Sequence, residues 1–188
     1  MSTVAHSPEV VSVEEFLAGE WRSERKQDYL GGALYTIPDA SGAHNVIAVN
    51  LIGLLHPQLR GKPCQQFGSD MKVRLQNLGD TYFYYPDAMV ACDPTDSGHG
   101  WRDRPTVLFE IISDETRRVD EREKRFVYLQ IPSLQAYVRI EQSSPEAVVE
   151  RRTNAWHGEK YTGLDAVLEL PEIGVRLALA ELFERLTF

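Results

Sequence analysis

Cysteine is scarce in this sequence: Cys64 and Cys92 are its two cysteines among 188 residues. They form no Cys-x-x-Cys pair and have no histidine at the spacing of zinc ligands, which argues against a cysteine-based metal site. Two cysteines far apart in the chain also argue against a disulfide framework. We therefore expect a protein of the reducing cytoplasm.

Long hydrophobic runs are absent as well. No apolar segment approaches the ~20 residues that a membrane span needs. Residues 1–13 contain Glu9, and no basic residue precedes Arg22, so the start of the sequence does not resemble a secretory signal. We expect no association with a membrane.

An excess of positive charge is lacking too. The 20 Lys and Arg residues face 28 Asp and Glu residues, which gives a net charge of −8. This balance argues against a protein that coats nucleic acid through bulk charge, although an enzyme with a local basic groove remains compatible with it. The length and the 43% of hydrophobic residues are typical of one globular domain, here 1–188.

The hydrophobic patterns predict an α/β or α+β fold in which helices flank a mixed β-sheet. Ser12 and Glu15 form a capping box that begins a short helix, and Pro57 is expected to break the second helix near its end. Helices are expected at 12–19, 41–59, 116–131 and within 175–188, and extended segments at 28–37, 64–75, 82–85, 88–92, 106–112, 134–141 and 147–152.

The segment Val107–Ile112 predicts a strand covered on both faces, and Glu110 interrupts its apolar side chains. A buried carboxylate requires a cation, hydrogen bonds or a proton. Taken alone, Glu110 is most simply a strand-end glutamate paired with a nearby arginine. Asp87 similarly follows Pro86 and enters an apolar run, and alone it indicates only a turn.

The helix after the Glu110 strand carries further charged residues. On a wheel of 100° per residue, Asp120 and Lys124 lie together at one edge of the apolar face, on the side that packs toward Glu110. Glu123 falls within that face, which is unusual for a purely structural helix. A simple helix ion pair is the alternative for Asp120 and Lys124. The positions that define the apolar face are Val119, Phe126, Val127 and Ile131.

Together these residues indicate a metal-dependent hydrolase. Two carboxylates at neighbouring strand ends, Asp87 and Glu110, can hold one Mg²⁺ or Mn²⁺ ion. The ion polarises a phosphodiester oxygen and acidifies a bound water. The Lys124 ammonium can orient that water or stabilise the charge on phosphate oxygens.

The same residues resemble the PD-(D/E)xK nuclease superfamily, and more narrowly the bacterial Uma family of restriction-endonuclease-like proteins. Further similar segments cover most of the chain. The resemblance implies a restriction-endonuclease-like core and DNA as the substrate. The motif residues are Tyr85-Pro86-Asp87, Glu110-Ile111-Ile112-Ser113, Asp120 and Glu123-Lys124, and the other similar segments are 29–35, 43–45, 68–73, 133–137 and 182–183.

The resemblance also implies roles for single residues. Asp87, Glu110 and the Ile111 carbonyl would be metal ligands. The lysine of the motif is absent because Ile112 occupies its place, and Lys124 on the next helix would replace it. The residues in supporting roles would be Asp28, His44, Asp120 and Glu123.

The sequence also departs from the family pattern. Where the family has further acids, this chain has Gly31 and Ala33, and it keeps only Asp28. A second hypothesis is therefore a catalytically degenerate protein that uses a nuclease fold for binding or assembly. A homodimer is compatible with either hypothesis, because nucleases that cut both strands often pair.

Overall fold

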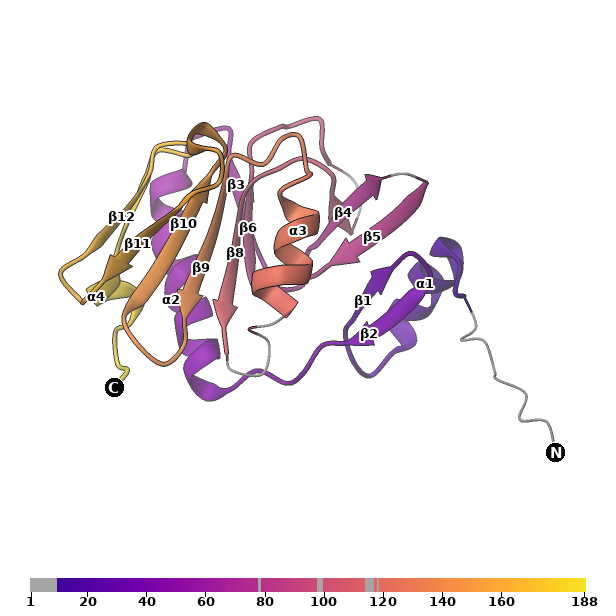
Figure 1. Ribbon diagram of the computed structural model, residues 1–188, viewed down its shortest axis with the longest axis horizontal. Helices are drawn as coiled ribbons and strands as arrows, with labels where there is room; N and C mark the ends of the chain where they lie inside the picture. Colours follow the sequence, from indigo (N-terminus) through magenta and orange to yellow (C-terminus); the bar gives the residue numbers. More distant parts are fainter. Residues whose placement is uncertain (1–9, 78, 98–99, 114–116, 118) are drawn as a thin grey trace.

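The computed structural model describes residues 10–77, 79–97, 100–113, 117 and 119–188 (Figure 1). Its centre is a six-stranded sheet in which β8 and β9 run parallel and the other neighbours run antiparallel. In spatial order, the strands are β11 (Gly158–Thr162), β10 (Glu146–Arg151), β9 (Ala136–Glu141), β8 (Pro105–Ile112), β6 (Ala88–Ala91) and β3 (Gln65–Gly68).

A second, five-stranded sheet and a small hairpin complete the β-structure. The second sheet orders its strands as β2 (Ala33–Thr36), β1 (Gln27–Leu30), β5 (Asp80–Tyr84), β4 (Lys72–Asn77) and β7 (Trp101–Arg102). The hairpin pairs β12 (Val167–Leu170) with β13 (Val175–Ala178). The mixed α+β architecture expected from the sequence is confirmed.

Helices lie on both faces of the six-stranded sheet. The α-helices are α1 (Val13–Gly19), α2 (Gly42–Leu59), α3 (Arg125–Tyr128) and α4 (Leu179–Leu182), and a π-helix at Val119–Lys124 leads directly into α3. Helix α2 covers one face (Figure 1), and α3 covers the other together with β4 and β5. Within the described residues, none of the helices combines the length and hydrophobicity needed to cross a bilayer.

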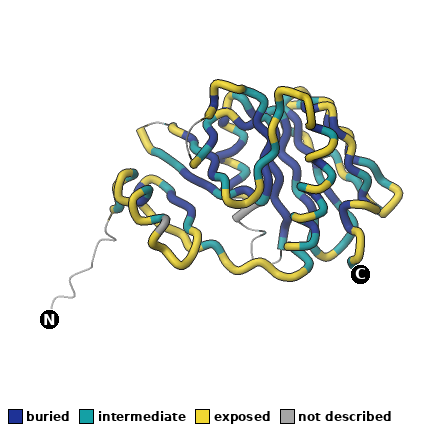
Figure 2. Tube along the Cα trace, turned by 180° about the vertical axis from the view of Figure 1, so that it is seen from behind, coloured by how far each residue is buried: buried dark blue, intermediate teal, exposed yellow. Residues whose placement is uncertain are grey.

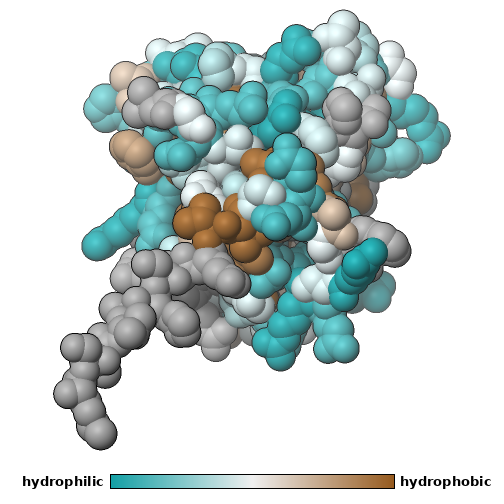
Figure 3. All heavy atoms as spheres, turned by 90° about the vertical axis from the view of Figure 1, so that its right-hand side faces the viewer, coloured by the Kyte–Doolittle hydropathy of each residue, from teal (hydrophilic) through white to brown (hydrophobic). Residues whose placement is uncertain are grey.

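The buried residues form two large clusters, one on each face of the central sheet. In Figure 2 the buried positions are concentrated along the central strands. The first joins the apolar face of α2 to β6, β8, β9 and the β12–β13 hairpin. The second places Tyr128 of α3 against Met89, Leu108 and Tyr137 of the sheet. A smaller aromatic cluster of Phe16, Tyr29 and Phe83 holds α1 on the five-stranded sheet. Figure 3 views that side of the molecule, where a small apolar group lies within a mostly polar surface.

Two expectations for the N-terminal half are confirmed and one is refined. Ser12 caps α1 with the complete capping box to Glu15. The helix expected at 41–59 is α2, and Ser41 caps it. The segment 28–37 is not continuously extended, because it reverses at Gly31-Gly32 to form the β1–β2 hairpin. Both glycines adopt positive φ, +56° and +100°, which such a tight turn requires.

Two predictions on continuity are wrong. Pro57 does not break the second helix, since α2 continues to Leu59 with Pro57 inside it. The segment 64–75 is not one strand, because a turn at Ser69–Asp70 separates β3 from β4 and sends the two strands into different sheets. The apolar alternation of residues 71–75 belongs to β4 alone.

The prediction against a disulfide is also wrong, since Cys64 and Cys92 are bonded to each other. Cys64 precedes β3 and Cys92 follows β6, and these strands are antiparallel with Gln65 opposite Ala91. The next residues outward are therefore opposite each other, which spacing along the chain does not reveal. The disulfide removes the argument from cysteine to a reducing compartment, so cytoplasmic location stays a prediction without that support.

Candidate active site

Asp87 and Glu110 come together because their strands are neighbours. Asp87 directly precedes β6, and Glu110 lies within β8. Ala88, the first residue of β6, pairs with Phe109 of β8, and Asp87 and Glu110 are the residues next to this pair. Both side chains line the same cleft. The structure thus brings together the two carboxylates that the sequence singled out.

The Asp87 carboxylate is held by groups from both sides. Its Oδ2 accepts a hydrogen bond of 2.7 Å from the main-chain N–H of Ile111. Its Oδ1 lies 3.1 Å from Nε2 of His44, and both side chains are largely buried. This contact places His44 beside Asp87 at the candidate site.

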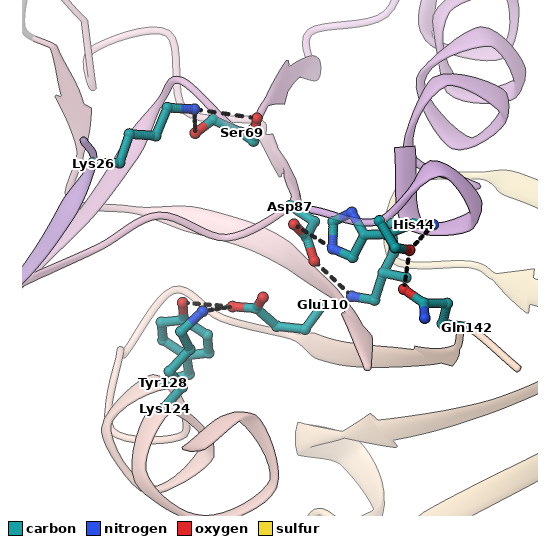
Figure 4. A network of polar contacts seen from close by, with 10 residues as sticks. Lys26, His44, Ser69, Asp87, Glu110, Lys124, Tyr128 and Gln142 are labelled. Carbon is teal, nitrogen blue, oxygen red and sulfur yellow. Dashed lines mark hydrogen bonds and ion pairs between the residues drawn. The ribbon is translucent and has the colours of Figure 1, made fainter. Parts of the chain in front are cut away.

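The N-terminus of α2 fixes His44. The hydroxyl of Ser41 accepts a hydrogen bond of 3.1 Å from the His44 N–H, and it donates one of 2.7 Å to the side chain of Gln142, just after β9. The cap therefore attaches the start of α2 to the edge of the site (Figure 4).

The Glu110 carboxylate is buried, with 2% of the residue exposed. Lys124 Nζ lies 3.1 Å from Oε1 of Glu110, and the hydroxyl of Tyr128 donates to the same oxygen at 2.9 Å. A buried charge is tolerated only when it is paired and hydrogen-bonded, and both conditions are met here. Figure 4 shows the Lys124 and Tyr128 side chains converging on Glu110 from one helix.

Tyr128 is a site residue that the sequence reasoning missed. Burial raises the pKa of its phenol well above the usual value, and the negative charges of Glu110 and then Asp28 raise it further. The phenol therefore keeps its proton at neutral pH and remains a hydrogen-bond donor to Glu110. A signal was available, because Tyr128 lies four positions after Lys124 and so on the same side of the helix.

The helical wheel placed Lys124 correctly but misplaced two of its neighbours. Phe126 is 70% exposed, not buried, and Glu123 is exposed and not within the apolar face. The π-helix at Val119–Lys124 explains the difference, since its wider turns change the rotation per residue on which the wheel depends. The side chain of Asp120 lies outside the described residues, so its expected role is not placed.

Asp28 lies on β1 and is buried, with 6% of the residue exposed. Its Oδ1 accepts a hydrogen bond of 3.1 Å from the Tyr85 N–H, two residues before Asp87. Its charge raises the pKa of Tyr84, although burial is the larger cause. This placement is compatible with the supporting role expected for Asp28.

A cleft of about 700 Å³ is lined by Asp87, Glu110, Lys124 and His44. One wall contains Asp87, Glu110 and Lys124, and the segment around Arg25 and Lys26 forms part of the opposite wall. Gly31 and Ala33 are not among the residues that line it. Both residues belong to the β1–β2 hairpin.

The donor set is suited to a hard divalent cation. Asp87, Glu110 and the carbonyl of Ile111 offer oxygen atoms, the ligands that Mg²⁺ prefers. Among the described residues, no three His, Cys, Asp or Glu side chains are arranged to hold a metal ion. Mg²⁺ is commonly bound by one or two carboxylates, with water and phosphate oxygens completing its coordination, so two carboxylates are sufficient.

Comparison with known proteins gives consistent results. Residues 13–180 match the family model Uma2, described as "Putative restriction endonuclease". Two Synechocystis proteins are similar to the chain. The protein slr1290 is 31% identical over 98% of this chain and 100% of its own length, and sll1609 is 29% identical over 74% and 79%.

A solved structure supports the fold. A crystal structure of a protein from Anabaena variabilis, described as a "putative nuclease belonging to DUF820", superposes with a TM-score of 0.72. The match covers 92% of this chain and 97% of that one at 18% identity. At this identity the likeness shows a shared fold.

Proposed function

The chain belongs to the Uma2 family, and from this premise we propose that it is a Mg²⁺- or Mn²⁺-dependent endonuclease that hydrolyses phosphodiester bonds in DNA. The observation that carries the proposal is the contact of Lys124 with Glu110, in a cleft that Asp87 shares. The sequence pattern singled out these three residues from separate elements, and phosphodiester hydrolysis needs their three groups together.

Asp87, Glu110 and the Ile111 carbonyl would hold the cation. When bound, the cation supplies a Lewis acid that polarises a phosphate oxygen and a means of acidifying water. The hydrogen bond from the Ile111 N–H orients the Asp87 carboxylate, and the contact with His44 holds it from the other side.

Lys124 contributes the positive charge that the reaction needs. Its ammonium is buried beside Glu110 at the wall of the cleft. From there it can orient the attacking water and stabilise the charge that develops on the phosphate oxygens. Tyr128 donates to the same oxygen of Glu110 and thereby holds the carboxylate that Lys124 contacts.

A second candidate, a nuclease fold that binds without cleaving, is favoured by one specific observation. Both carboxylates already have partners without a metal: Glu110 has Lys124 and Tyr128, and Asp87 has His44. In that case, calorimetry would detect no binding of Mg²⁺ or Mn²⁺.

The test of the proposed activity is cleavage of circular DNA, both single-stranded and supercoiled duplex, with Mg²⁺ or Mn²⁺ and with EDTA. We expect metal-dependent cleavage by the wild type. Lys124→Met should lower the rate by about 100-fold or more, because it removes a charge that acts on the transition state.

The matched control is Lys72→Met. Lys72 is as buried as Lys124, at 6% against 7% exposed, and it pairs with Glu20 at 2.6 Å. Each variant leaves a carboxylate without its ammonium, at a cost of roughly 3–5 kcal/mol in the free energy of unfolding if the pair is fully buried. Only Lys124→Met should lose cleavage. Equal cleavage by the two variants, or wild-type cleavage that survives EDTA, would contradict the proposal.

A further inference from the structure

A second groove, of about 520 Å³, joins the cleft at Asp87. One side is the exposed face of α2, and the other is the end of β3 with the turn into β4. The groove and the cleft share four lining residues, so the two form one continuous depression. The shared residues are Asn45, Ala48, Ser69 and Asp87.

Beyond these shared residues, the groove is largely apolar. Val49 and Ile52 line it from α2, and Phe67 and Met71 line it from the opposite side. Val49 is 62% exposed, although it lies in the middle of a long helix. The Phe67 ring is held in place by the Arg102 guanidinium, 4.5 Å from its centroid. A groove with fixed apolar walls and polar residues at its mouth is suited to a flat ring with polar edges.

The charge of the protein makes such apolar contacts necessary for binding a nucleic acid. The chain carries a net charge of −8, and the residues that line the cleft include four acidic and three basic side chains. Neutralisation of phosphates, which supplies most of the affinity for duplex DNA, is therefore weak here. Base contacts, by contrast, do not depend on the net charge of the protein.

We propose that this groove binds an unpaired nucleobase next to the phosphate at Asp87, and that the substrate is single-stranded or locally unpaired DNA. The inference rests on the proposed function. In a B-form duplex the bases are stacked inside and cannot enter the groove unless they are flipped out at an energetic cost. A single strand presents its bases without that cost, which makes it the preferred substrate.

Lys26 lies where the groove meets the cleft. Its Nζ donates to the main-chain carbonyl of Ser69 at 3.0 Å (Figure 4). It also lies 2.5 Å from a carboxylate oxygen of Asp70. Its side chain is 42% exposed. The Asp70 side chain is 93% exposed, so a phosphate can replace it beside the ammonium. One strand would then run from the groove past Lys26 into the cleft.

The test is a binding measurement that needs no catalysis. Fluorescence anisotropy compares a labelled oligodeoxynucleotide with the same strand annealed to its complement, with Ca²⁺ in place of Mg²⁺. Val49→Gln makes the groove polar without adding charge, and glutamine is a good helix former, so α2 is retained. Leu164→Gln is the matched control, because Leu164 is 48% exposed and does not line the groove.

We expect the wild type to bind the single strand about 10-fold more tightly than the duplex, and Val49→Gln to lose about 10-fold in affinity for the single strand. Leu164→Gln should bind as the wild type does. An abasic site at the base that enters the groove should weaken wild-type binding, and its effect should not add to that of Val49→Gln.

Equal binding of the duplex and the single strand, or equal binding by the two glutamine variants, would overturn the inference. These outcomes differ from failure of the proposed function. If the protein binds single strands through Val49 but never cleaves them, the inference about the groove stands and the proposed nuclease activity fails. If it cuts duplex DNA regardless of Val49, the nuclease activity stands and the inference about the groove fails.

Discussion

At the scale of single residues, Glu110 is the residue whose burial most requires compensating partners. Its carboxylate lies within a strand that is buried on both faces, and it is satisfied by Lys124 and Tyr128. The helical wheel turned Lys124 toward the sheet that carries Glu110, whereas for Glu110 taken alone the sequence favoured a nearby arginine as the partner. The sequence did not predict Tyr128. The spacing from Lys124 put Tyr128 on the same side of the helix, but a tyrosine there fits a core position equally well.

The buried phenol predicts an alkaline limit to stability. Because the pKa of Tyr128 is raised in the folded protein, the fold retains a proton that the unfolded chain loses above about pH 10. The unfolded state then binds fewer protons, so the free energy of unfolding decreases as pH rises above that value. In Tyr128→Phe this decrease should be shallower by about 1.4 kcal/mol per pH unit.

Urea unfolding followed between about pH 9 and about pH 11 measures both slopes. The same slope in Tyr128→Phe and in the wild type would show that this phenol does not resist ionisation in the fold.

At the scale of elements, the sequence predicted a helix or strand correctly where all the residues that determine it lie in one short segment. The capping box of α1 and the extended segments expected at 134–141 and 147–152, which form β9 and β10, are confirmed because their determinants are neighbours in sequence. No local signal tells which sheet a strand joins. For this reason residues 64–75 were predicted as one strand, although they form β3 and β4 in two different sheets. The π-helix before α3 likewise depends on packing, and it shifted Phe126 out of the core.

The two serine caps provide a prediction for the elements that position the site. Ser12→Ala and Ser41→Ala each remove an N-cap hydroxyl, and each should lower the free energy of unfolding by about 1 kcal/mol. Only Ser41 holds the helix that carries His44. Ser41→Ala should therefore raise the KM for DNA several-fold, whereas Ser12→Ala should leave cleavage unchanged. Unfolding curves and initial cleavage rates for the two serine variants check this prediction. Equal cleavage rates for the two variants would show that the Ser41 cap does not affect the site.

At the scale of the whole molecule, the disulfide connects an edge strand to the strand that begins after Asp87. Cys64 and Cys92 are 28 positions apart, and closing such a loop stabilises a fold by about 3–4 kcal/mol in the chain-entropy model. Cys92 follows the end of β6 opposite to Asp87, so the bond supports the sheet without touching the site.

We therefore expect dithiothreitol to lower the urea midpoint while the metal-dependent rate, measured without denaturant, stays the same. The Cys64→Ser, Cys92→Ser double variant should unfold at the lower midpoint with and without the reductant. A loss of cleavage on reduction alone would show that the bond also shapes the cleft. The homodimer and the cytoplasmic location expected from the sequence stay predictions at this scale.

The central claim is that Asp87 and Glu110 together hold a divalent cation. The most direct measurement is an anomalous difference map from crystals soaked in Mn²⁺. The account predicts one peak about 2 Å from carboxylate oxygens of both residues and from the Ile111 carbonyl. A map with no peak between these two side chains, or with its peak at other acids, would contradict it.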